Sequence, residues 1–81
     1  MNIFVGNLSR QTEESDLQEA FAGYGQVSTV KIVKDMYSGQ SRGFGFIEMP
    51  NKAEADAAIY NLNGKELKGR PIKVNEARAR S

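Results

Sequence analysis

The residues of this chain best suited to a binding chemistry stand in the stretch Arg42–Met49, RGFGFIEM. Side chains of a β-strand alternate between two faces, so Phe44 and Phe46 share one face with an arginine and a glutamate. The other face carries two glycines followed by Ile47 and Met49. If those two apolar side chains face the core, both rings stand in the open beside a cation. The pattern therefore predicts an aromatic platform for flat, anionic ligands.

Composition excludes several other kinds of site. Among its 81 residues the chain has no cysteine and no histidine, which removes disulfides, thiol nucleophiles, the commonest general base and the usual zinc ligands. A domain of this size buries only roughly 60 to 65 percent of its unfolded surface, which favours an open binding face over an enclosed cavity. We therefore expect no catalytic residue, no metal site, no cofactor and no small-molecule substrate.

Hydropathy bears on where the protein works. No apolar run approaches the ~20 residues that a membrane-spanning helix needs, and Met1 directly precedes the first strand-like segment. We therefore expect no membrane contact and no signal peptide. The expected protein is a soluble intracellular monomer, cytoplasmic in a bacterial source and nuclear or organellar in a eukaryotic one.

Charge is distributed unevenly, although the net charge is only +1. Two helix-like segments, 12–24 and 51–62, hold six acidic residues and one lysine, so the remaining segments are positive overall. If both helices pack on one side of a sheet, its opposite face is the positive one and suits phosphates. Part of this pattern has a second interpretation, because Glu13 and Glu14 would also complement the dipole at the start of a helix.

The platform needs a sheet to position it, and the periodicity of the apolar residues predicts one. Alternation indicates strands, and a period near 3.6 indicates helices. The expected strands are 2–6, 27–35, 42–49 and 70–75, and the expected helices are 12–24 and 51–62. The order βαββαβ with right-handed crossovers predicts an α+β, ferredoxin-like (split βαβ) sandwich, a four-stranded antiparallel sheet with both helices on one face.

Local signals predict how these elements begin and pack. Thr12 is the expected N-cap of the first helix, and Asn51 with Glu54 forms the expected capping box of the second. In the third strand, Gly43 and Gly45 are expected to leave room for the helices packed beneath the sheet.

Two short motifs carry a family resemblance. IFVGNL at residues 3–8 and RGFGFIEM resemble the ribonucleoprotein hexamer and octamer of the RNA recognition motif, and the run D-x-x-S-G-x-S-R-G-F-G-F from Asp35 fits as well. The resemblance covers a domain at 1–77 and leaves a short basic tail at 78–81. The chain resembles the short bacterial and cyanobacterial RNA-binding proteins with a single motif, and the plant glycine-rich ones. Met49 departs from the octamer, which usually ends in Phe or Tyr, and we expect altered core packing there without loss of binding.

The resemblance implies an interface for single-stranded RNA, with single-stranded DNA left open. Phe4 would join the two phenylalanines of the octamer, with bases on Phe4 and Phe44 and riboses against Phe46. Stacking on an aromatic side chain contributes roughly 1 to 3 kcal/mol per base. Phosphates or base edges would meet polar side chains of the open face and of the sheet edge, where amide and main-chain groups could read a base. The polar residues expected in these roles are Asn2, Lys31, Arg42, Lys73, Asn75, Glu76 and Arg78.

Two other functions use the same fold. In a protein-interaction module, the rings would be covered by a partner protein or by the tail. A small hydrolase of the acylphosphatase kind would need a glycine-rich, phosphate-cradling loop after the first strand, and residues 7–11 offer one arginine without that turn. The strand lysines also have a simpler interpretation as solvated residues that protect sheet edges.

Overall fold

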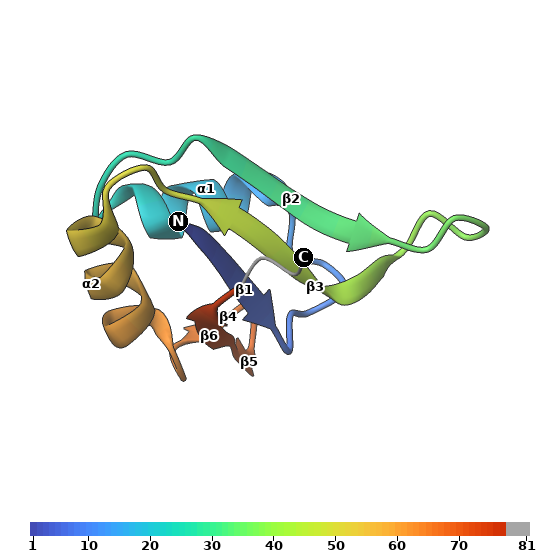
Figure 1. The fold of residues 1–81 in the computed structure, drawn as a ribbon. Helices are drawn as coiled ribbons and strands as arrows, with labels where there is room; N and C mark the ends of the chain where they lie inside the picture. The colour runs from blue at the N-terminus through green and yellow to red at the C-terminus, as the bar shows by residue number, and fades with distance from the viewer. Residues whose placement is uncertain (78–81) are drawn as a thin grey trace.

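A four-stranded sheet organises the computed structural model, which describes residues 1–77. Its elements are β1 (Asn2–Gly6), α1 (Glu14–Ala22), β2 (Thr29–Lys34), β3 (Ser41–Glu48), α2 (Lys52–Leu62), β4 (Glu66–Leu67), β5 (Arg70–Pro71) and β6 (Lys73–Glu76). The strand order is β2-β3-β1-β6, and each neighbouring pair is antiparallel. In Figure 1, α1 lies behind β2 and β3, and α2 lies to the left of β1. The predicted split βαβ sandwich is confirmed.

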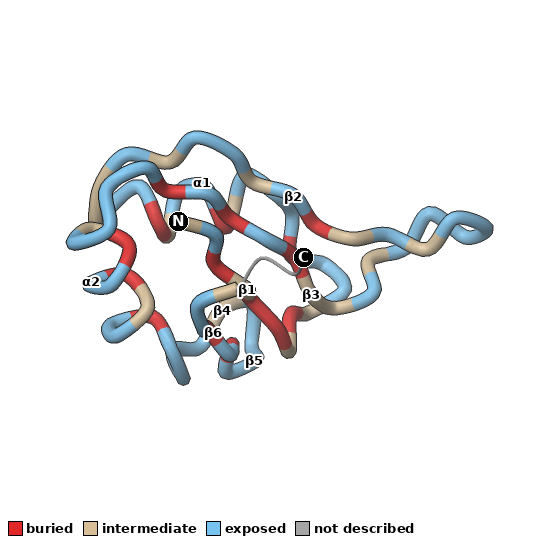
Figure 2. The backbone as a smooth tube through the Cα atoms, viewed as in Figure 1, coloured by how far each residue is buried: buried red, intermediate tan, exposed pale blue. Residues whose placement is uncertain are grey.

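Apolar side chains from both helices and from one face of the sheet form the core (Figure 2). Ile47 and Met49 are buried in it, as their positions on β3 predict, together with Ile3 and Val5 of β1. The helices contribute a further set of buried residues, Leu17, Phe21, Ala55, Ala58 and Leu62. Because alternate residues of a strand face opposite ways, this burial leaves the aromatic positions of β1 and β3 on the open side.

A small hairpin precedes the last strand and was not predicted. β4 and β5 pair through Glu66 with Pro71 and Leu67 with Arg70. The two residues between these strands, Lys68 and Gly69, have φ values of 53° and 86°. Positive φ at both central positions suits a tight two-residue hairpin turn. The expected strand at 70–75 is therefore divided, and only Lys73–Glu76 joins the main sheet.

The helix caps differ in part from the expected ones. Glu13, not Thr12, is the N-cap of α1, and its N–H donates to the carboxylate of Asp16 at 2.8 Å. Thr12 is buried instead. Asn51 caps α2 as predicted by accepting from the N–H of Glu54 at 3.0 Å. The carboxylate of Glu54 does not complete a capping box, because it accepts from the N–H of Gln26 at 3.1 Å.

Gly45 gives β3 space for its neighbouring strand, and not for a helix. A Cβ atom at this position would collide with the carbonyl oxygen of Lys31 and lie 3.1 Å from the Cα of Ile32. Both are backbone atoms of β2, just before the register shift between Ile32 and Lys34. The absence of a side chain at Gly45 thus allows the backbone of β2 to lie close to β3. The expectation that this glycine leaves room for the helices was wrong. No helix among residues 1–77 is long and apolar enough to span a membrane.

Candidate nucleic-acid interface

Three phenylalanine rings form one cluster on the open face of the sheet. Phe4 stands opposite Phe46 in the β1–β3 register, and their ring centroids lie 5.8 Å apart. Phe44 lies 6.0 Å from Phe4 and 6.3 Å from Phe46. These spacings are those of favourable tilted and edge-to-face ring contacts. We call these three residues the aromatic cluster.

The rings are not equally accessible. Phe46 is 40% exposed, whereas Phe4 and Phe44 are half-buried. Phe46 also meets both of the other rings at steep angles, 64° and 88°, while Phe4 and Phe44 are tilted by only 32°. Phe46 therefore offers the largest free aromatic surface of the cluster.

Gly6 provides the space in which the Phe4 ring rests. Residues 4 and 6 of a strand share a face, and a Cβ atom on Gly6 would lie 2.8 Å from Cε2 and 3.0 Å from Cζ of that ring. Gly6 is buried although its face is the open one, because the ring lies across it. Its φ is not positive, so the position needs glycine for the ring and not for the backbone. Nothing in the sequence alone indicates this role.

One row of side chains crosses all four strands of the open face. Lys31 of β2 stands opposite Phe46, Phe46 stands opposite Phe4, and Phe4 stands opposite Asn75 of β6. Directly opposed residues of antiparallel strands share a face. The row therefore has a cation at one end, an amide at the other and two rings between them.

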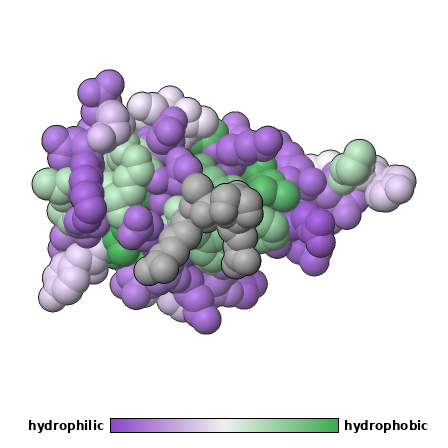
Figure 3. All heavy atoms as spheres, viewed as in Figure 1, coloured by the Kyte–Doolittle hydropathy of each residue, from purple (hydrophilic) through white to green (hydrophobic). Residues whose placement is uncertain are grey.

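Polar residues flank this row on both sides. Asn2 stands opposite Glu48, and Lys73 stands opposite Gly6 on the far side of the rings. Arg42 is exposed near the start of β3. Figure 3 shows the hydrophobic surface on this side of the molecule bordered by hydrophilic residues. The structure thus brings these predicted polar residues around the cluster, on the face opposite the acidic helices.

Two of the predicted site residues fall outside this arrangement. Glu76 stands opposite the buried Ile3, so its side chain lies on the helical side of the sheet. Its charge there contributes, after the larger effect of Asp56, to the raised pKa of Lys52 on α2. The sequence predicts that residues 75, 76 and 78 continue from the last strand across the sheet edge, but the alternation along β6 puts the side chain of Glu76 on the helical side. Arg78 and the predicted tail at 78–81 lie outside the described residues.

Asp35 shapes the loop that joins β2 to β3. Its carboxylate accepts from the N–H groups of Tyr37 at 2.8 Å and Ser38 at 3.0 Å. The bond from Ser38, then that from Tyr37, lowers the pKa of Asp35 below 3.8, and the charge of Arg42 lowers it slightly further. Asp35 is therefore a structural acceptor of the loop, which extends beyond the sheet in Figure 1, and the ring of Tyr37 in that loop is exposed.

An open sheet face that carries a ring cluster inside a positive border, on a split βαβ fold, defines a module for single-stranded nucleic acid. The family comparison agrees with this class. Residues 3–73 match the model of the RNA recognition motif, and the chain belongs to that family. Phe4 in the hexamer and Phe44 and Phe46 in the octamer occupy the positions that the resemblance implied.

Individual proteins are similar over nearly the whole chain. RbpE of Nostoc sp. is 49% identical over 80 residues, which cover 99% of this chain and 81% of that protein. The crystal structure of RNA binding protein PG1 superposes with a TM-score of 0.94 at 42% identity, covering 100% of this chain and 98% of that one. The structure of the Rna15 domain with bound RNA (GU) has a TM-score of 0.85 at 26% identity, covering 96% and 83%.

Proposed function

We propose that this protein binds single-stranded RNA on the open face of its sheet and acts in post-transcriptional RNA handling. The observation that carries the proposal is the cross-strand row in which Phe46 and Phe4 stand between Lys31 and Asn75. Strands of a sheet lie about 4.8 Å apart, so successive unpaired bases can each meet a ring along this row. Membership of the family and the RNA held by the similar Rna15 domain support the same conclusion.

Exposure of the rings suggests a division of roles that differs from the expected one. Phe46, the most exposed ring, and Phe4, its partner in register, would each stack a base. Phe44 lies beside both rings and away from the row, so it would contact the riboses. This proposal differs from the division implied by the family resemblance, which places bases on Phe4 and Phe44 and riboses against Phe46.

Polar groups at the border would neutralise the backbone and read the bases. Lys31 and Lys73 stand on opposite sides of the aromatic cluster and can contact phosphates. The amides of Asn75 and Asn2 each offer both donors and an acceptor to a base edge. Asn75 adjoins Phe4 in register, so it is the residue best placed to select the base stacked there.

The alternative of a protein-interaction module has less support. Such a role does not require three clustered rings bordered by cations, and the structurally similar proteins named above are RNA-binding proteins. No enzyme family is indicated by the family match.

The proposal is tested by titrating a fluorescent single-stranded RNA of mixed sequence with Phe46→Ala and Phe4→Ala variants. A stacked base contributes roughly 1 to 3 kcal/mol, so each variant is expected to weaken binding about 5- to 150-fold. Tyr60→Ala is the matched control, because Tyr60 is an aromatic residue of α2, 86% exposed, that lies off the sheet. Wild-type affinity in both phenylalanine variants would refute the proposal. The same oligonucleotide made as DNA measures the contribution of the 2′-hydroxyl groups.

A further inference from the structure

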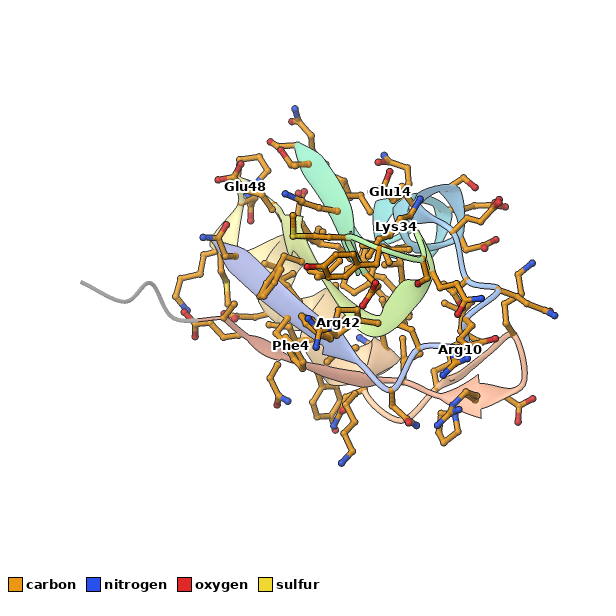
Figure 4. All side chains as sticks on the ribbon, turned by 90° about the vertical axis from the view of Figure 1, so that its right-hand side faces the viewer. Phe4, Arg10, Glu14, Lys34, Arg42 and Glu48 are labelled. Atoms are coloured by element: carbon orange, nitrogen blue, oxygen red, sulfur yellow. The ribbon has the colours of Figure 1, made fainter. Side chains whose placement is uncertain are left out.

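Three arginines from separate parts of the chain border one open pocket at the end of the sheet. Arg10 comes from the loop between β1 and α1, Arg42 from the start of β3 and Arg70 from β5. The pocket has a volume of about 350 Å³. The remaining lining residues are Asn7, Leu8, Ser41 and Gly43. Figure 4 shows Arg10 near the β4–β5 hairpin and Arg42 nearer to Phe4.

Hydrogen bonds hold two of these segments together at the pocket. The guanidinium of Arg70 donates to Oδ1 of Asn7 at 2.8 Å, and Nδ2 of Asn7 donates to the carbonyl of Pro71 at 2.7 Å. Asn7 has a φ of 56°, a left-handed conformation that asparagine tolerates better than most residues. This turn at the end of β1 fixes Arg70 at the pocket.

A second contact places the Arg10 loop against β3. The N–H of Leu8 donates to the carbonyl of Gly43 at 2.9 Å, and the N–H of Gly43 donates to the hydroxyl of Ser41 at 3.1 Å. Arg42 lies between these two β3 residues. The pocket is therefore formed by backbone and side-chain bonds that do not involve the guanidinium groups of Arg10 and Arg42.

No ion pair among residues 1–77 neutralises the positive charge of the pocket. Within residues 1–77, none of the three arginines has a carboxylate oxygen within the 4.0 Å of an ion pair. Arg42 contributes slightly to the lowered pKa of Asp35, and the carboxylate of Asp35 already accepts from two backbone N–H groups. Guanidinium groups suit phosphate, to which they donate paired hydrogen bonds. A polar pocket with three such groups and no carboxylate in its lining is suited to a phosphate.

We propose that this arginine pocket binds a phosphate group of the RNA strand whose bases stack on Phe46 and Phe4. The inference rests on the proposed function and extends it by a subsite. β1 runs from Phe4 through Gly6 directly to Asn7, and β3 runs from Arg42 to Phe44, so the pocket continues the aromatic cluster along both central strands. A strand that crosses the rings can enter the pocket with an internal phosphodiester or with a terminal phosphate.

The experiment measures RNA affinity as a function of salt for Arg10→Gln and Arg70→Gln. For single strands, the slope of log K against log salt becomes shallower by about 0.7 for each phosphate that the protein no longer neutralises. Each variant is also expected to weaken binding roughly three- to tenfold, as for a partly exposed charge-assisted hydrogen bond. Lys65→Gln is the matched control, since it removes one exposed positive charge outside the pocket lining. It should change the slope much less than either arginine variant.

Two further arms sharpen the result. Arg70→Lys keeps the charge but removes the planar fork, so the salt slope should stay while affinity falls. Oligonucleotides with and without a terminal phosphate distinguish the two sources of the group. A gain from that phosphate seen only with the arginines intact identifies a strand end, and equal binding identifies an internal phosphodiester. Because Arg10 forms no side-chain hydrogen bond within the described residues, Arg10→Gln keeps the test valid even if Arg70→Gln loosens the hairpin.

The possible outcomes distinguish failure of the arginine pocket from failure of the proposed RNA-binding function. If both glutamine variants match Lys65→Gln in affinity and slope while Phe46→Ala loses binding, the subsite is overturned and the proposed function stands. If the wild-type protein binds no RNA, both are overturned. A shallower slope in both arginine variants with the control unchanged supports the arginine pocket.

Discussion

Replacing Gly6 by alanine should weaken RNA binding without weakening the fold. The added Cβ would lie 2.8 Å from Cε2 of Phe4, whereas carbon atoms in van der Waals contact lie about 3.5 to 4.0 Å apart. The ring must therefore withdraw by roughly 0.7 to 1.2 Å, and the clash is with the far end of a side chain that can rotate. A displaced ring keeps part of its stacking energy. Of the roughly 1 to 3 kcal/mol per stacked base, we expect a loss of about 1 kcal/mol, or fivefold in Kd.

The same Gly6→Ala substitution should raise the free energy of unfolding. Gly6 has no positive φ, and alanine at a compatible position stabilises by about 0.4 to 1 kcal/mol because it restricts the unfolded chain. Gly23→Ala is the matched control, since a Cβ there would meet only the carbonyl oxygen of Ala20 at an ordinary 3.7 Å, at the end of α1. Fluorescence anisotropy gives the affinity and urea unfolding gives the stability. An RNA affinity equal to that of the wild type in Gly6→Ala would refute the claim that Gly6 provides the space for the Phe4 ring.

Three further predictions follow from particular contacts. Lys73→Gln should reduce the salt slope of RNA binding by about 0.7, whereas Lys52→Gln, which removes a lysine paired with Asp56 on α2, should leave it unchanged; equal slopes would contradict a phosphate contact at Lys73. Gly45→Ala forces a Cβ atom against the backbone of β2, and we expect the free energy of unfolding, measured with urea, to fall by about 1 to 3 kcal/mol, as at other overpacked sites. An unchanged free energy of unfolding would show that β2 can move aside. Asp35 has a folded pKa below its unfolded value of 3.8, so the stability that its ionised carboxylate contributes is complete above that pH and is lost as the pH falls through the folded pKa. Asp35→Asn should remove this part of the acid dependence of stability. Identical profiles of unfolding free energy against pH in the variant and the wild type would contradict the prediction.

The aromatic face could be predicted because alternation alone separates Phe44 and Phe46 from Ile47 and Met49. The same alternation along β6 would have placed the side chain of Glu76 on the helical side of the sheet. The β4–β5 hairpin could not be found from periodicity, since strands of two residues are shorter than any repeat. Its signal was the Lys68-Gly69 pair at the turn.

Other features depend on contacts between segments distant in sequence. Asn7 and Arg70 are joined by a hydrogen bond across 63 positions, and no local pattern indicates that pair. The tight approach of Gly45 to β2 depends on a register shift in the neighbouring strand. The relative exposure of the three rings likewise depends on how they pack together. Sequence patterns therefore identified both helices, the main sheet and the open face, whereas the relative exposure of the three rings required the structure.

The central claim is that bases stack on Phe46 and Phe4. The most direct measurement is an NMR titration of the protein, labelled at its aromatic side chains, with a short single-stranded RNA. We predict ring-current shifts and intermolecular NOEs from the Phe46 and Phe4 ring protons to base protons, contacts from Phe44 to ribose protons, and no change at Tyr60 on α2. Shifts confined to the helices, with both rings unchanged at saturating RNA, would contradict the account.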